Sequence, residues 1–105
     1  MRSRSPLRRP KYAPSEVTQE WIGHIVFHPA VEAKLRTKHR VTPGQVREAV
    51  AYGAADSLTW HTHPVYGERL IATGSDQQGP MIVYLRPIDR TDGTWECLTA
   101  RRWDD

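Results

Sequence analysis

Two short apolar runs in the last third of the chain have the character of β-strands. Residues 81–85 read Met-Ile-Val-Tyr-Leu, residues 95–100 read Trp-Glu-Cys-Leu-Thr-Ala, and the segment 89–93 between them is rich in Asp, Thr and Gly. Two further segments of strand character span residues 58–61 and 68–73. Connections of this length and composition join antiparallel strands. The second half of the chain is therefore predicted to form a β-meander.

The first half of the chain predicts one strand and two helices. The apolar run 21–27 stops at a His-Pro pair and predicts a strand. Because proline suits the first turn of a helix, we expect a helix from Pro29 to about Lys38. Thr42 and Gln45 have the spacing of a capping box, with proline at the first helical position between them. A second helix should therefore span residues 43–52.

Side chains alternate along a strand, so the sheet should have two different faces. The face covered by the helices would carry Leu70, Ala72, Met81, Val83, Leu85, Leu98 and Ala100. The opposite face would carry Arg69, Ile71, Thr73, Tyr84, Arg86, Trp95, Thr99 and Arg101. This mixture of aromatic, hydroxyl and guanidinium groups is typical of an RNA-binding sheet. The expected fold is α+β, with two short helices packed on an antiparallel β-sheet of four to five strands.

Composition changes this picture mainly at the beginning of the chain. The 105 residues carry a net charge of +3, and residues 1–14 contain five basic side chains and few large apolar ones. We expect residues 1–14 to form a disordered basic arm and residues 15–105 to form a single domain. Without the arm the domain is close to neutral. Evidence for a nucleic-acid partner must therefore come from the positions of individual cations.

Cysteine content and hydropathy indicate the compartment. Cys97 is the single cysteine, which excludes an internal disulfide and fits a reducing environment. No apolar run approaches the ~20 residues of a membrane span. The basic N-terminus lacks the apolar stretch of a secretory signal. We expect a cytoplasmic protein with no membrane partner.

Arginines follow the two strands of the last third. Arg86 follows the first, and Arg101 and Arg102 follow the second. Arginine suits phosphate because its guanidinium group stays charged and offers a planar fork of donors. The sequence therefore points to a nucleic-acid ligand. The residues expected to bind RNA are Tyr84, Arg86, Thr99 and Arg102.

RNA cleavage by the 2′-hydroxyl group requires a base, an acid for the leaving oxygen, and cations for the charge on phosphorus. His39 could transfer protons, with charge from Lys38, Arg69 and Arg101. Each residue also has a structural interpretation, since His39 could cap the first helix and the arginines could form surface ion pairs. The convergence of Arg69 and Arg101 on one face with Tyr84 favours the functional interpretation.

Two histidines raise the question of a metal. His61 and His63 lie on one side of a predicted strand, but no third ligand is evident, because Cys97 and Glu68 lie on other strands. Tetrahedral metal sites normally have more ligands than this. We therefore expect exposed histidines at a hairpin end, no bound metal and no other cofactor.

Five short motifs occur in a fixed order between about residues 22 and 102. They are His28-Pro29-Ala30, Lys38-His39 followed by Val41-Thr42, Glu68-Arg69 leading into residues 70–74, Val83-Tyr84, and residues 98–102. In this order and spacing the chain resembles the BrnT-like toxins of the RelE superfamily of bacterial ribonuclease toxins.

The resemblance implies two helices on an antiparallel sheet and metal-independent cleavage of mRNA, which can be ribosome-bound, to inhibit translation. It implies a type II toxin–antitoxin system, in which a cognate antitoxin protein neutralises the toxin. The residues that would inherit site roles are Lys38, His39, Arg69 and Arg101.

The chain departs from the family pattern in three places. Arg40 stands where glycine commonly follows the Lys-His pair, and Pro80-Met81 stands where a basic residue often enters the strand. The sequence also stops at Asp105 without a further basic tail. These departures bear on activity more than on fold. The alternative is a catalytically inactive toxin-like scaffold that binds a protein partner or nucleic acid. A DNA-recognition helix over residues 42–53 is ranked last, because Arg47 is its one well-placed basic contact.

Overall fold

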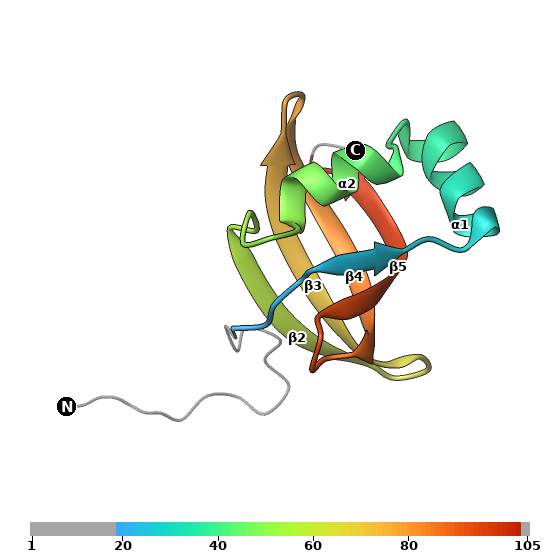
Figure 1. Cartoon of the computed structure of the whole chain (residues 1–105). Helices are drawn as coiled ribbons and strands as arrows, with labels where there is room; N and C mark the ends of the chain where they lie inside the picture. Colours follow the sequence, from blue (N-terminus) through green and yellow to red (C-terminus); the bar gives the residue numbers. More distant parts are fainter. Residues whose placement is uncertain (1–18, 104–105) are drawn as a thin grey trace.

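The computed structural model describes residues 19–103 and has the predicted α+β fold, with helices packed on one sheet (Figure 1). The elements are β1 (His24–Val26), α1 (Pro29–Lys34), a π-helical turn η1 (Leu35–His39), α2 (Pro43–Val50), β2 (Ser57–His63), β3 (Gly67–Asp76), β4 (Gly79–Asp89) and β5 (Thr94–Arg102). The expected arm, residues 1–14, lies outside the described residues. Within residues 19–103, every helix is too short or too polar to cross a membrane.

The sheet is mixed rather than wholly antiparallel. Strands β2 to β5 form the predicted antiparallel meander, and the strand order is β1-β5-β4-β3-β2. Strand β1 lies parallel to β5, with Ile25 opposite Trp95. The chain passes through α1, η1 and α2 between β1 and the meander. A connection of that length can return the chain in either direction, so it permits a parallel edge strand.

Helix α2 begins with the predicted capping box. The N–H of Gln45 donates to Thr42 Oγ1 at 3.2 Å, and the N–H of Thr42 donates to Gln45 Oε1 at 2.9 Å. The helix buries three small apolar side chains, those of Val46, Ala49 and Val50. It lies across one face of the sheet (Figure 1), and a Cβ at Gly74 would stand 1.9 Å from the carbonyl oxygen of Ala49. Glycine at position 74 therefore permits the close approach of α2 to β3.

The first helix is shorter than predicted and changes type. Its N-cap is His28, whose Nδ1 accepts a hydrogen bond from the N–H of Ala30 at 3.2 Å. Regular α-helix ends at Lys34, and one π-helical turn follows over residues 35–39. The turn ends at Arg40, whose backbone is left-handed, with φ 57° and ψ 43°. Arg40 thus adopts the conformation that glycine favours.

The predicted buried face is confirmed for β3 and β4 and is wrong for part of β5. The confirmed residues are Leu70, Ala72, Met81, Val83, Leu85 and Ala100, all fully buried. A β-bulge interrupts the pairing of β4 with β5, because Tyr84 lies opposite Thr99 while Leu85 lies opposite Cys97. The extra residue, Leu98, leaves the buried face and is only half-buried. A bulge of one residue moves the side chains beyond it to the opposite face of the sheet from the one that simple alternation predicts.

Trp95 shows the effect of this reversal. The sequence predicts it on the face away from the helices, yet its side chain is fully buried. Its Nε1–H donates to the carbonyl oxygen of Trp21 at 2.9 Å, and its ring lies 5.9 Å from that of Trp60. Trp95 therefore connects the segment that leads into β1 with the hydrophobic core.

Candidate functional site

The sheet face turned away from α2, called the open face below, carries most of the predicted site residues. The β3–β4 register places Ile71 opposite Tyr84, and the β4–β5 register places Tyr84 opposite Thr99. Arg69 and Arg101 each lie two residues from this row and therefore on the same face. Most side chains of the open face are half-buried and that of Arg86 is exposed, whereas those of the opposite face form the core.

Arg69 lies in a recess of about 400 Å³ at one end of the open face. The residues that line it are Lys34, Tyr66, Arg69, Arg86, Leu98 and Thr99. The guanidinium carbon of Arg69 lies 5.0 Å from the ring centroid of Tyr84. Such stacking shields one face of the guanidinium group and leaves its in-plane donors available for an anion. We call this hollow the Arg69 recess.

Two buried nitrogen atoms beside the recess have no hydrogen-bond partner. Among the side chains of residues 19–103, they are Nε of Arg69 and Nδ1 of His61. The two residues lie directly opposite each other in the β2–β3 register. Folded proteins pair nearly all buried polar groups, and an exception calls for a specific explanation. This pair of unpaired atoms therefore calls for an explanation, such as an ordered water, strain or a bound ligand.

Arg86 and Arg102 both form ion pairs. Arg86 Nη2 lies 2.5 Å from Glu96 Oε1, and the side chain of Arg86 is 54% exposed. Arg102 lies opposite Met81 and thus on the buried side of the sheet. Its Nη1 and Nη2 bind the two carboxylate oxygens of Asp76 at 2.5 and 2.9 Å. Arg102 therefore closes the β3–β4 hairpin and does not share the open face with Arg69.

Arg101 lies farther along the open face than the recess. It is opposite Ile82, which is in turn opposite Thr73. Thr73 and Arg69 are four residues apart on β3, a separation of about 13 Å along the strand. The two arginines are therefore placed to contact different groups of an extended ligand.

Lys38 and His39 lie outside the recess. They end the η1 turn, which packs against β5, the strand that carries Thr99 and Arg101. Lys38 is exposed and His39 is half-buried. The structure thus brings Arg69, Arg86 and Thr99 into one recess, and it sets Lys38 and His39 on a neighbouring element.

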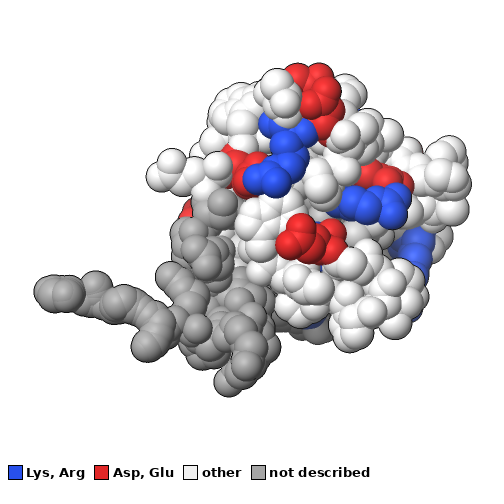
Figure 2. Space-filling model, turned by 90° about the horizontal axis from the view of Figure 1, so that it is seen from below, with Lys and Arg blue, Asp and Glu red and all other residues white. Residues whose placement is uncertain are grey.

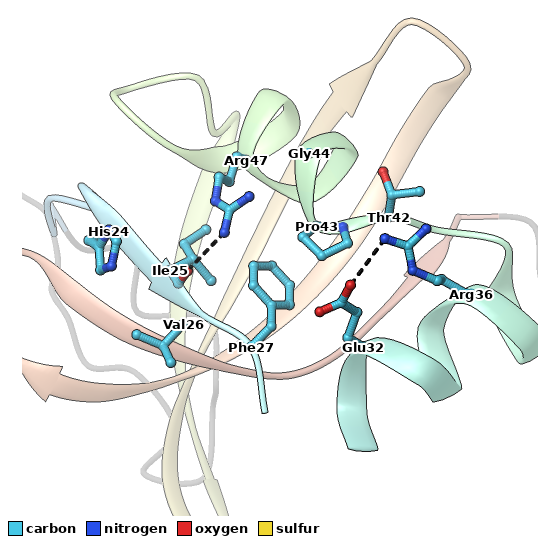
Figure 3. Close-up of a pocket in the computed structure, with 10 residues that line it drawn as sticks. All are labelled: His24, Ile25, Val26, Phe27, Glu32, Arg36, Thr42, Pro43, Gly44 and Arg47. Carbon is cyan, nitrogen blue, oxygen red and sulfur yellow. Dashed lines mark hydrogen bonds and ion pairs between the residues drawn. The ribbon is translucent and has the colours of Figure 1, made fainter. Parts of the chain in front are cut away.

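A second, larger hollow lies between β1, α1 and the start of α2 (Figure 3) and contains none of the predicted site residues. Its volume is about 640 Å³. Arg36 Nη2 lies 3.0 Å from Glu32 Oε2. Arg47 lies over the ring of Phe27 and approaches the carbonyl oxygen of Ile25 at 3.5 Å. Both arginines are engaged locally, and Arg47 lies at the edge of β1. We therefore assign the candidate site to the Arg69 recess.

His63 has a local structural contact, and the described residues show no metal cluster. Nδ1 of His63 accepts hydrogen bonds from the N–H groups of Val65 and Tyr66 at 3.0 and 3.2 Å. Across residues 19–103, no three His, Cys, Asp or Glu side chains come together to hold a metal ion.

The face seen in Figure 2 carries charge of both signs. Lys and Arg side chains form separate patches there, with Asp and Glu close by. The ion pairs of Arg90 with Glu20 and of Arg86 with Glu96 also set opposite charges side by side. The pictured face therefore offers an anionic ligand individual cations rather than an extended basic surface.

Sequence reasoning did not assign His61 or Tyr66 to the site. The three-residue connection 64–66 fixes the hairpin register and puts His61 opposite Arg69, which is a signal that the sequence contains. Tyr66 reaches the recess from that same connection. Compared with protein-family models, with curated proteins and with solved structures, the chain gives no match in any of the three.

Proposed function

We propose that this protein is a metal-independent endoribonuclease toxin of the BrnT-like type, which acts on RNA in the cytoplasm and is neutralised by a cognate antitoxin. The observation that carries the proposal is the Arg69 guanidinium group, stacked on Tyr84 in a recess with two further cations, Lys34 and Arg86. The order of motifs along the chain supports the same assignment.

The recess offers the groups that a single-stranded RNA needs. The in-plane donors of Arg69 match the non-bridging oxygens of a phosphodiester. Tyr66 on the recess wall can stack on an unpaired base, and the hydroxyl group of Thr99 can accept or donate a hydrogen bond. Arg101, farther along the same face, would contact a neighbouring phosphate.

The proposed reaction is an internal transfer at phosphorus. The 2′-oxygen of the substrate attacks the adjacent phosphorus, the bond from phosphorus to the 5′-oxygen breaks, and a cyclic phosphate and a 5′-hydroxyl end result. His39 accepts the proton of the 2′-hydroxyl group or supplies one to the 5′-oxygen, with water as the other partner. Arg69 and Lys38 stabilise the negative charge that builds up on the phosphoryl oxygens.

The test is inducible expression in bacteria, together with cleavage of mRNA by the purified protein in the presence of translating ribosomes and EDTA. The unaltered protein should arrest growth and cleave RNA. Arg69→Ala should relieve the arrest and slow cleavage about 100–1000-fold, as expected for removal of one preorganised anion-stabilising group. Arg101→Ala should also relieve the arrest.

Arg36→Ala is the matched control, because Arg36 is exposed and its partner is Glu32, away from the recess. It should remain toxic. All variants must keep the melting temperature of the unaltered protein. An unaltered protein that neither slows growth nor cleaves RNA would contradict the proposal.

One observation favours a second candidate, a binding module without catalysis. The six residues that line the Arg69 recess include no histidine and no carboxylate, the side chains that most often transfer protons in enzymes. A binding module would retain a labelled single-stranded RNA without cutting it, and Arg69→Ala would weaken that binding. Intact RNA after prolonged incubation with ribosomes would favour this candidate over the nuclease.

A further inference from the structure

The two unpaired nitrogen atoms beside the recess are chemically complementary. Arg69 Nε always carries a hydrogen and can only donate, whereas His61 Nδ1 accepts whenever the hydrogen of the neutral ring is on Nε2. Both atoms are buried and the two residues face each other across β2 and β3, yet no hydrogen bond joins them in this structure. One donor and one acceptor, each without another partner, could satisfy each other after a small adjustment.

We infer that His61 is a positioning residue for Arg69: when an RNA phosphate enters the recess, Arg69 Nε–H donates to His61 Nδ1, and the two terminal nitrogens of the guanidinium group then point at the phosphate. The inference rests on the RNA-binding part of the proposed function. Hydrogen bonds of this kind are often long in an empty site and shorten when the ligand binds.

Stacking on Tyr84 leaves Arg69 free to rotate within the plane of its guanidinium group. A fixed partner at Nε removes that freedom, because it sets the in-plane orientation of the guanidinium group and leaves the end-on donors of the two Nη atoms for the phosphate. Preorganisation of a charged donor in this way strengthens binding without adding a contact to the ligand.

The arrangement makes RNA binding sensitive to protonation of His61. Protonated His61 carries an N–H at Nδ1 that opposes the N–H of Arg69, and it adds a like charge beside the guanidinium group. Among the described residues, the titratable or charged groups next to His61 in the sheet are His63 on the same strand and Glu68 and Arg69 on β3, the strand that pairs with β2. Tyr84 and Arg86 follow on β4.

The first experiment measures the affinity of the full chain for a fluorescein-labelled single-stranded RNA oligonucleotide at pH 8 and at pH 5.5. The unaltered protein should bind less tightly at pH 5.5. His61→Leu removes the acceptor and should weaken binding at pH 8 about 10-fold or more, as loss of a hydrogen bond to a charged group does. His61→Gln offers an amide oxygen in place of Nδ1. It should retain the binding seen at pH 8 and lose most of the difference between the two pH values.

His24→Gln is the matched control, because His24 is exposed on β1 and lines the second hollow rather than the Arg69 recess. It should keep both the affinity and its pH dependence. If His61→Leu lowers the melting temperature, the comparison of His61→Gln with His24→Gln still decides the question. Equal pH dependence in His61→Gln and the unaltered protein would overturn the inference.

The second experiment needs neither RNA nor activity. Long-range ¹⁵N–¹H spectra of the imidazole rings report which nitrogen carries the hydrogen, and His61 should show hydrogen on Nε2 at pH 8. Hydrogen on Nδ1 overturns the inference whatever the RNA results. If the hydrogen is on Nε2 but the unaltered protein does not bind RNA, the proposed function is wrong. The positioning role, which depends on RNA binding, is then wrong as well.

Discussion

The guanidinium group of Arg102 binds both carboxylate oxygens of Asp76 across the β3–β4 hairpin. The side chain of Asp76 is 2% exposed and that of Arg102 is 13% exposed, so this is a nearly buried ion pair at the end of the sheet. The hydrogen bonds from Arg102 lower the pKa of Asp76 below its usual value of 3.8.

The first prediction concerns acid stability. A carboxyl group whose pKa is lower in the folded state stabilises the fold above its unfolded pKa, and this stabilisation is lost as pH falls from that value through the lower folded one. Asp76→Asn should therefore lower the free energy of unfolding at pH 7 by about 1.5–3 kcal/mol and flatten its decline below pH 4. Urea unfolding at several pH values measures both effects. As a control, Arg86→Ala, at a 54% exposed ion pair, should change stability by about 0–1 kcal/mol.

The second prediction tests the β-bulge in β5. Leu85 is fully buried, and Leu85→Ala should destabilise the protein by about 2–5 kcal/mol. Leu98 is the residue that the bulge turns away from the core. Leu98→Ala should therefore lower the free energy of unfolding by clearly less than Leu85→Ala does. Equal losses in chemical denaturation would mean that Leu98 belongs to the core and that the register is regular.

The third prediction concerns the left-handed residue at the end of η1. The left-handed conformation destabilises a residue that has a side chain by roughly 1–2 kcal/mol. Glycine avoids this strain, but it loses more backbone entropy on folding, so the net gain is smaller. Arg40→Gly should therefore raise the free energy of unfolding by about 0.5–1 kcal/mol. Arg40→Ala keeps a Cβ and should give no such gain. A stabilisation shared by both variants would point to the lost charge rather than to the backbone.

The fourth prediction concerns Cys97. Burial of its side chain raises the pKa of the thiol to about 12, so almost none of the reactive thiolate form is present at neutral pH. A thiol reagent at pH 8 should label the folded protein only as fast as it unfolds and should label the urea-unfolded chain at once. Rapid labelling without urea would show that β5 opens locally.

Local signals in the sequence predicted the elements well. Thr42 and Gln45 form the predicted capping box because such a motif depends on four neighbouring residues only. The alternation of Leu70 and Ala72 on β3 with Val83 and Leu85 on β4 likewise placed these side chains on the buried face.

Features that depend on distant parts of the chain could not be predicted in the same way. The bulge at Leu98 appears only when β5 is aligned with β4, and it reverses the expected position of Trp95. The parallel pairing of β1 depends on where the chain returns after α2. In the site, by contrast, the alternation of β3 put Arg69 on the correct face, and the short connection 64–66 contains the signal that places His61 opposite Arg69, although the sequence analysis did not use it.

The pairing of β1 with β5 has a consequence for the order of folding. The first and last strands of the sheet are neighbours, and the Trp95 Nε1–H that donates to the carbonyl of Trp21 comes from a residue 74 positions later. Contacts over such separations form slowly and cannot form before both partners have been synthesised. During translation, β1 and η1 must therefore wait for β5, the strand against which both pack and which also carries Thr99 and Arg101 to the open face. The sheet and this part of its open face are completed in one late step.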